Sequence, residues 1–169
     1  PPMAGVPYLR EQISTKLLRL YGAPLDPEHE ITVTSGATEA IFVAVQCVVR
    51  AGDQVIVFDP AYDSYEPAVT LAGGRTIHVP LLTPDFSIDF DRLEEAINDR
   101  TRLIIINSPH NPCGSVISAG DLDQLAELVR LRDLMLLSDE VYEHMVYDGA
   151  AHCSVLTHEE LRQRSFVVS

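Results

Sequence analysis

Residues Leu134-Met135-Leu136-Leu137-Ser138-Asp139 form an apolar run that ends at a carboxylate, and this stretch decides the fold. A short apolar run bounded by polar residues is typical of a strand buried inside a sheet. A second run, Leu103 to Ile106, ends at Asn107 in the same way. Ligands of α/β proteins bind where parallel strands end, so these two strand ends predict a binding site at one edge of a sheet.

Strand-like and helix-like segments alternate on both sides of this stretch, which predicts one α/β domain with three layers, α/β/α, around a mostly parallel sheet. We predict strands at residues 31–34, 54–58, 75–80, 102–107, 134–139 and 166–168. We predict helices at residues 7–21, 37–49, 65–72, 89–99, 119–130 and 155–164.

Composition excludes several classes of protein. The 169 residues are 46% apolar, enough for a substantial core, and the net charge of −13 argues against a nucleic-acid partner. No apolar run approaches the roughly 20 residues of a membrane span, so we expect no membrane insertion. Cys47, Cys113 and Cys153 are odd in number and lack metal-ligand spacing, which favours unpaired thiols and a cytoplasmic location.

The turn Ser35-Gly36-Ala37-Thr38 lies where a predicted strand gives way to a helix. Backbone N–H groups at the positive end of that helix could hold a phosphate. Alternatively, Ser35 only caps the helix and Glu39 complements its dipole. The sequence contains neither a P-loop nor a dinucleotide fingerprint, so a phosphate without a nucleotide fits better.

Asp139 indicates which kind of ligand would carry this phosphate. A carboxylate fixed at the end of a buried strand can keep a pyridine nitrogen protonated, which favours pyridoxal phosphate (PLP), whose ring then accepts electrons from the substrate. A competing interpretation is the strand end with Asp139 and Glu140 that holds magnesium in nucleotide hydrolases. The missing phosphate loop argues against that interpretation, and we predict no metal site.

Three further residues follow predicted strands. Tyr62 could stack on the cofactor ring, although Tyr62 and Tyr65 could equally cover the end of the sheet. Asn111 could donate to the phenolic oxygen of the cofactor and contact a substrate carboxylate. Alternatively, asparagine before proline forms an ordinary turn. The Asn111–Pro112 peptide bond can be cis. Tyr142 could reach the same oxygen as Asn111. We assign His110 no role.

The chain resembles the class I and II aminotransferases, which are fold-type I PLP-dependent enzymes. The resemblance covers essentially the whole chain and rests on five ordered segments: Pro1–Gly22, Thr34–Ala40, Asp59–Tyr65, Asn107–Pro112 and Ser138–Glu143. Within the family the sequence is most similar to the methionine and kynurenine aminotransferase branch. That similarity lies chiefly in Asp63-Ser64-Tyr65 and Pro109-His110-Asn111-Pro112.

The resemblance implies a PLP-binding large domain and assigns a role to each candidate residue. The turn Gly36 to Thr38 would bind the cofactor phosphate, and Tyr62 would stack on the ring. Asn111 and Tyr142 would contact the phenolic oxygen, Asp139 would pair with the pyridine nitrogen, and Asn111 would also hold the substrate carboxylate. The activity implied is amino-group transfer from an amino acid to a 2-oxo acid by a homodimer.

The resemblance also implies that residues 1–169 are an incomplete large domain. We expect the Schiff-base lysine beyond Ser169, and an amino-terminal arm and a small carboxyl-terminal domain outside the chain. Lys16 is the chain's one lysine, and its helical position predicts a solvated side chain that cannot substitute. We therefore expect no catalysis from these residues alone. The alternatives are a PLP-dependent carbon–sulfur lyase and a noncatalytic PLP-binding or interaction fragment.

Overall fold

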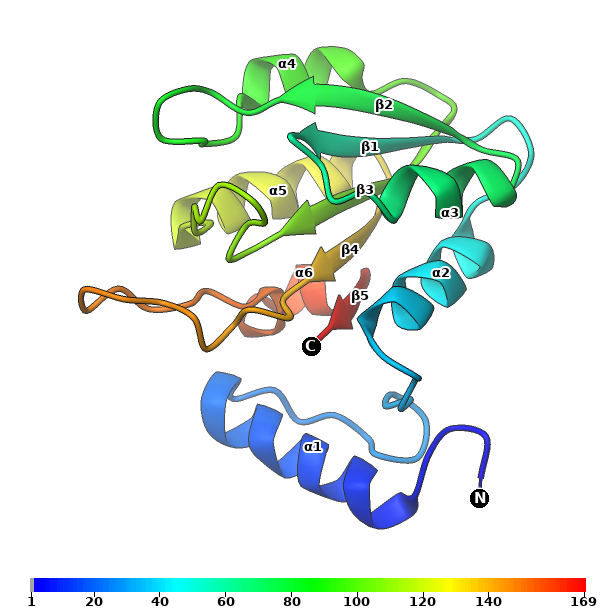
Figure 1. Cartoon of the computed structure of the whole chain (residues 1–169), viewed down its shortest axis with the longest axis vertical. Coiled ribbons are helices and arrows are strands. Elements are labelled where there is room, and N and C mark those ends of the chain that lie inside the picture. Colours follow the sequence, from blue (N-terminus) through cyan, green and yellow to red (C-terminus); the bar gives the residue numbers. More distant parts are fainter. Residues whose placement is uncertain (1) are drawn as a thin grey trace.

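Five parallel strands form one sheet in the computed structural model, which describes residues 2–169. The strands are β1 (Gln54–Asp59), β2 (Arg75–Pro80), β3 (Thr101–Asn107), β4 (Met135–Asp139) and β5 (Ser165–Val168). They lie in the order β2-β1-β3-β4-β5, with all carboxyl ends at one edge (Figure 1). Asn107 is the register partner of Asp139, so the two predicted strand ends are neighbours.

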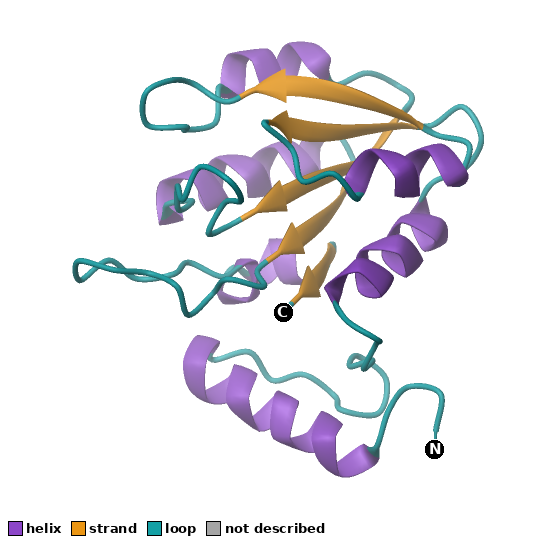
Figure 2. Ribbon diagram, viewed as in Figure 1, coloured by secondary structure: helices purple, strands orange, loops and turns teal. Residues whose placement is uncertain are grey.

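Helices cover both faces of this sheet (Figure 2). One face carries α2 (Ala37–Val48) and α3 (Tyr65–Leu71), and the other carries α4 (Phe90–Ala96), α5 (Ala119–Leu131), a 3₁₀ turn η1 (Val155–Thr157) and α6 (Glu159–Arg162). The predicted three-layer α/β/α class is therefore confirmed. No helix within residues 2–169 is long and apolar enough to cross a bilayer.

Alternation of side chains along β3 shows how the layers are built. Ile104 and Ile106 are buried against α5, whereas Leu103 and Ile105 are buried against α2. A strand sends successive side chains to opposite faces, and a strand covered on both faces is therefore apolar throughout. This double burial explains why the central strands were recognisable as apolar runs.

Helix α1 (Pro7–Tyr21) lies at one side of the layered body (Figure 1). Pro7 occupies its first turn, where the missing N–H costs nothing, and Gly22 ends it with a φ of 66°. Leu17 packs against Leu156 in a small third core cluster. Arg10 donates to the carbonyl of Pro27 at 2.6 Å, which ties the helix to the segment that follows it.

Three predictions of local structure were wrong. Residues 31–34 form no strand; the segment is irregular, and the Val33 amide donates to the carbonyl of Ala4 at 3.0 Å. The helix predicted at 89–99 ends at Ala96. The helix predicted at 155–164 is divided by His158, whose backbone is extended, into η1 and α6.

Candidate functional site

Asp139, the last residue of β4, is buried at the carboxyl edge of the sheet with 4% of its surface exposed. The Tyr65 hydroxyl donates to its Oδ2 at 2.7 Å, and the Val141 amide approaches Oδ1 at 3.4 Å. Burial raises the pKa of Asp139, and the hydrogen bond from Tyr65 opposes this rise. Because few protein donors satisfy this carboxylate, it can still accept from a ligand.

The end of β3 is hydrogen-bonded to the backbone of Asp139. The Asn107 side-chain amide donates to the Asp139 carbonyl at 2.9 Å, and the Ser108 backbone amide donates to the same oxygen at 3.0 Å. The Asn107 side-chain oxygen accepts from the backbone amide of Asn111 at 2.7 Å. Asn107 thus connects the loop that carries Asn111 to β4, and the Asn111–Pro112 bond is cis, as the sequence allowed.

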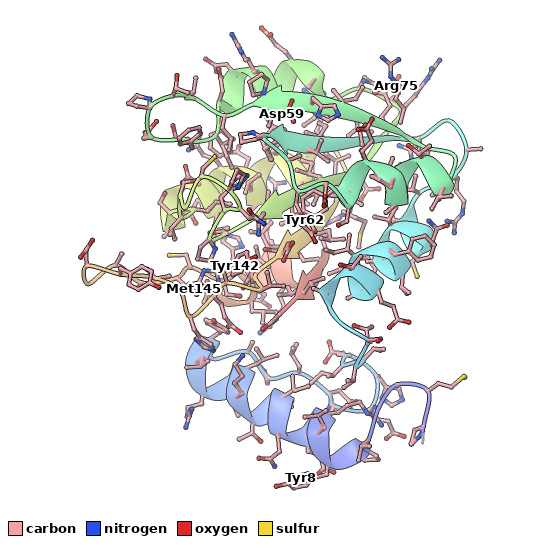
Figure 3. The ribbon with its side chains drawn as sticks, viewed as in Figure 1. Tyr8, Asp59, Tyr62, Arg75, Tyr142 and Met145 are labelled. Carbon is pink, nitrogen blue, oxygen red and sulfur yellow. The ribbon has the colours of Figure 1, made fainter. Side chains whose placement is uncertain are left out.

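The two predicted aromatic residues lie in the loops that follow β1 and β4 (Figure 3). Tyr62 exposes 37% of its surface, and its ring meets that of Tyr65 edge to face with centroids 5.7 Å apart. An edge contact leaves a face of Tyr62 available for a planar ligand. Tyr142 is half-buried in the turn after Asp139.

The start of α2 lies beside the end of β5 in Figure 1. Gly36 is the N-cap residue of this helix, with a φ of 95°, so the alternative prediction that Ser35 caps it is wrong. Glu39 instead accepts a hydrogen bond from the Ser35 amide. Among the described residues no acceptor meets the amides of Ala37 and Thr38, which leaves the helix end able to bind an anion.

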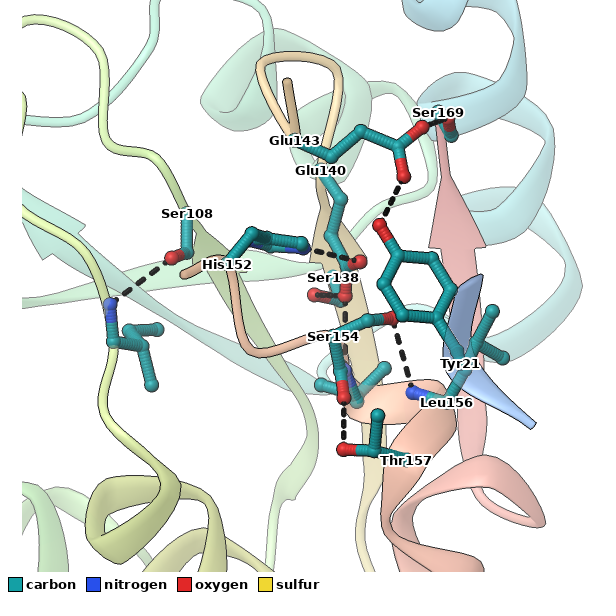
Figure 4. A network of polar contacts seen from close by, with 12 residues as sticks. Tyr21, Ser108, Ser138, Glu140, Glu143, His152, Ser154, Leu156, Thr157 and Ser169 are labelled. Atoms are coloured by element: carbon teal, nitrogen blue, oxygen red, sulfur yellow. Dashed lines mark hydrogen bonds and ion pairs between the residues drawn. The ribbon is translucent and has the colours of Figure 1, made fainter. Parts of the chain in front are cut away.

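Lys16 is half-buried and paired, whereas the sequence predicted a solvated side chain. Its Nζ lies 2.5 Å from Oε1 of the buried Glu143. The hydroxyls of Tyr21 and Ser169 also donate to this carboxylate (Figure 4). Burial would raise the pKa of Glu143, but these three donors outweigh it and lower the pKa from 4.5 to about 2. The prediction failed because α1 packs Lys16 against an element that lies far away in the sequence.

The Glu140 carboxylate forms its own set of contacts (Figure 4). Its Oε1 accepts from the Ser138 hydroxyl at 2.8 Å and from the Val155 amide at 3.1 Å, and its Oε2 lies 2.9 Å from Nε2 of His152. These contacts hold the loop between β4 and η1. The carboxylates of Asp139 and Glu140 therefore have different hydrogen-bond partners and are not arranged to bind one metal ion together.

Two surface hollows border the candidate site without including Asp139. One, of about 280 Å³, is lined in part by Asn107 and His110, and the other, of about 620 Å³, is lined in part by Tyr62 and His78. Burial lowers the pKa of His110. The hydrogen bonds of Asp139 define the site better than these hollows do, because they connect the end of β4 to the end of β3 and to the start of α3.

Sequence reasoning placed Asp139, Asn111 and Tyr62 at the correct strand ends, but it missed Tyr65 as a partner of Asp139 and Asn107 as the link between β3 and β4. Asn107 could have been found, because the apolar run Leu103 to Ile106 ends at it. Tyr65 could not, because no pattern in the sequence indicates that its hydroxyl reaches a strand end 74 residues away.

The parallel sheet with helices on both faces defines an α/β protein, and its candidate ligand site lies at the carboxyl edge of the sheet. The sequence model of the family described as aminotransferase class I and II matches residues 1–168, and the chain belongs to that family. It is 45% identical over 168 residues to a methionine aminotransferase of Escherichia coli, covering 99% of this chain and 44% of that protein.

Other relatives agree on the family. A probable N-succinyldiaminopimelate aminotransferase of Mycobacterium tuberculosis is 44% identical over 172 residues, covering all of this chain and 43% of that protein. The crystal structure of Escherichia coli YbdL, reported with a methionine aminotransferase function, superposes with a TM-score of 0.96 at 44% identity, covering 98% of this chain and 44% of that one. The chain thus spans less than half the length of these relatives.

Proposed function

We propose that the candidate site binds PLP and that the chain is the cofactor-binding large domain of an aminotransferase. The observation that carries the proposal is the buried Asp139 carboxylate at the end of β4, held by Tyr65 and adjacent to the loop of Asn107 and Asn111. A fixed anion at this position suits a protonated pyridine nitrogen.

The remaining residues fit the other parts of the same ligand. The uncapped start of α2, at Gly36 to Thr38, has backbone donors for the phosphate. Tyr62 has an open ring face for stacking, and Asn111 and Tyr142 supply polar groups for the phenolic oxygen. When bound, the cofactor ring supplies an electron sink for the bond broken at the substrate α-carbon.

The relatives support an amino acid and a 2-oxo acid as the substrates, with Asn111 contacting the substrate carboxylate. We further propose that the Schiff-base lysine follows Ser169, because the amine of Lys16 forms an ion pair with Glu143. A cytoplasmic homodimer completes the proposal. The free cysteines Cys47, Cys113 and Cys153 support the cytoplasmic location, and sedimentation of the whole protein tests the dimer.

The test is an amino-transfer assay on the whole protein supplied with PLP, a panel of amino acids and an acceptor 2-oxo acid. We expect a new 2-oxo acid only when the acceptor is present. Asp139→Asn should lower turnover by about a hundredfold or more, since Asn cannot hold the ring nitrogen protonated. Product formed without any acceptor would indicate the carbon–sulfur lyase instead, and no turnover with any donor would contradict the proposal.

A further inference from the structure

Tyr65 contacts no part of the cofactor in the binding scheme above, yet its hydroxyl makes the shortest side-chain hydrogen bond to the Asp139 carboxylate. It begins α3, exposes only 3% of its surface and packs among Ala68, Val69 and Leu137 in the core between α2, α3 and the sheet. Its hydroxyl reaches across 74 residues of sequence to Oδ2 of Asp139 at 2.7 Å. A buried tyrosine needs some hydrogen-bond partner, but few partners are themselves buried carboxylates at a ligand site.

The chemistry of this pair is asymmetric. Burial raises the pKa of the Tyr65 phenol, and the neighbouring negative charge of Asp139 raises it further, so the phenol keeps its proton. The hydrogen bond therefore runs from the Tyr65 hydroxyl to Oδ2 of Asp139, and it is stronger when that carboxyl is ionised than when it is protonated. The other titratable groups facing the pair are Tyr62, Tyr142 and Glu140, none of which offers a positive charge.

Tyr65 also contacts the second residue expected to meet the cofactor ring. Its own ring lies edge to face against Tyr62 at an interplanar angle of 74°. One rigid, buried side chain thus restrains both the anion and the stacking surface. Residues whose side chains are locked by packing can hold a binding group in a productive geometry more tightly than solvated ones can.

We infer that Tyr65 is a positioning residue that keeps Asp139 ionised and aimed at the pyridine nitrogen of the cofactor. The inference rests on the proposed function for the identity of the ligand, but the Tyr65–Asp139 pair itself does not depend on the cofactor. The two can therefore be tested separately.

The first experiment uses the chain without cofactor. The carboxyl carbon of Asp139 is followed by ¹³C NMR as pH is varied, in the wild type and in Tyr65→Phe, which keeps the buried ring and removes only the donor. We expect the titration midpoint of Asp139 to rise by about one pH unit or more in Tyr65→Phe. Tyr8→Phe, which alters an exposed tyrosine of α1, should leave the midpoint unchanged. An unchanged midpoint in a folded Tyr65→Phe variant would overturn the inference.

The second experiment measures PLP affinity by absorbance titration over a range of pH in four chains: wild type, Tyr65→Phe, Asp139→Asn and the double variant. We expect Tyr65→Phe to weaken binding about tenfold and to move the acidic loss of binding to higher pH, because a protonated Asp139 cannot pair with a protonated ring nitrogen. In the Asp139→Asn chain, adding Tyr65→Phe should weaken PLP binding by less than about twofold.

Equal weakening in both backgrounds would mean that Tyr65 acts through Tyr62 or through the core, and would overturn the inference. If the wild type binds no PLP while the NMR midpoint still shifts, the pair stands and the proposed cofactor is refuted.

Discussion

At the scale of single residues, the Glu143 side chain connects helix α1 to the chain next to the sheet. Its buried carboxylate accepts hydrogen bonds from Lys16 and Tyr21 of α1 and from Ser169, the residue after β5. A buried charge is tolerated only when partners of this kind replace the water that it has lost. This cluster explains how α1 remains attached although it lies outside the three layers.

We expect Glu143→Gln to lower the free energy of unfolding at pH 7 by about 2 kcal/mol or more, since it leaves Lys16 and the two hydroxyls without an anion. Urea unfolding measures the change. The matched control is Glu127→Gln on the exposed face of α5, which should change stability by less than about 0.5 kcal/mol.

The same cluster predicts the pH dependence of stability. The folded-state pKa of Glu143 is lowered from 4.5 to about 2, so its stabilising contribution is complete above pH 4.5 and is lost as pH falls toward 2. The stability gap between the wild type and Glu143→Gln should therefore narrow across this range. If the difference in unfolding free energy between the two chains stays constant from pH 7 to pH 3, the charge of Glu143 does not account for its contribution to stability.

Residues were predictable where their own neighbours in sequence carried the signal. Asp139 could be found because an apolar strand ends at it. The partners of Asp139 and Glu143 could not, because they come from segments 74 and 127 residues away, and a helical pattern does not report what packs against a polar face. Lys16 was placed incorrectly for this reason.

At the scale of elements, the start of α2 depends on one backbone conformation. Gly36 has a φ of 95° and a ψ of 167°, a region that residues with a Cβ adopt only at a cost. No atom lies within 4 Å of a Cβ placed there, so the cost of a substitution is conformational and not steric.

We therefore expect Gly36→Ala to destabilise the chain by about 1–2 kcal/mol and to weaken PLP binding through the displaced amides of Ala37 and Thr38. Thermal unfolding and a PLP titration measure the two effects. Gly120→Ala in α5 is the control, because Gly120 lies in a helix and an added Cβ would make only one ordinary contact, with the Ser118 hydroxyl oxygen at 3.7 Å. That change should stabilise the chain slightly. Destabilisation by Gly120→Ala alone would contradict this explanation.

Elements whose formation depends on local pattern were predicted well, whereas those that depend on a partner were not. Strand β3 and helix α5 were found within one residue at each end because their apolar periodicity is complete. Residues 31–34 have strand-forming composition, but a strand exists only when a neighbour pairs with it, and no strand pairs with them within residues 2–169.

At the scale of the whole molecule, two apolar clusters enclose the sheet and bring all its carboxyl ends to one edge. The alternation of strands and helices was enough to predict this arrangement, because parallel strands joined by helices can be connected in few ways. The candidate site is a consequence of that architecture: Tyr62, Asn111 and Asp139 come from loops or ends of β1, β3 and β4, which are adjacent in the sheet.

The most direct measurement is an absorbance titration of this chain with PLP, in the wild type and in Asp139→Asn, followed by borohydride reduction and mass spectrometry. We expect saturable binding by the wild type, at least about tenfold weaker binding by Asp139→Asn, and no reduced adduct on Lys16, whose amine is held by Glu143. Absence of saturable binding, or equal affinity of the two chains, would contradict a PLP site built around Asp139.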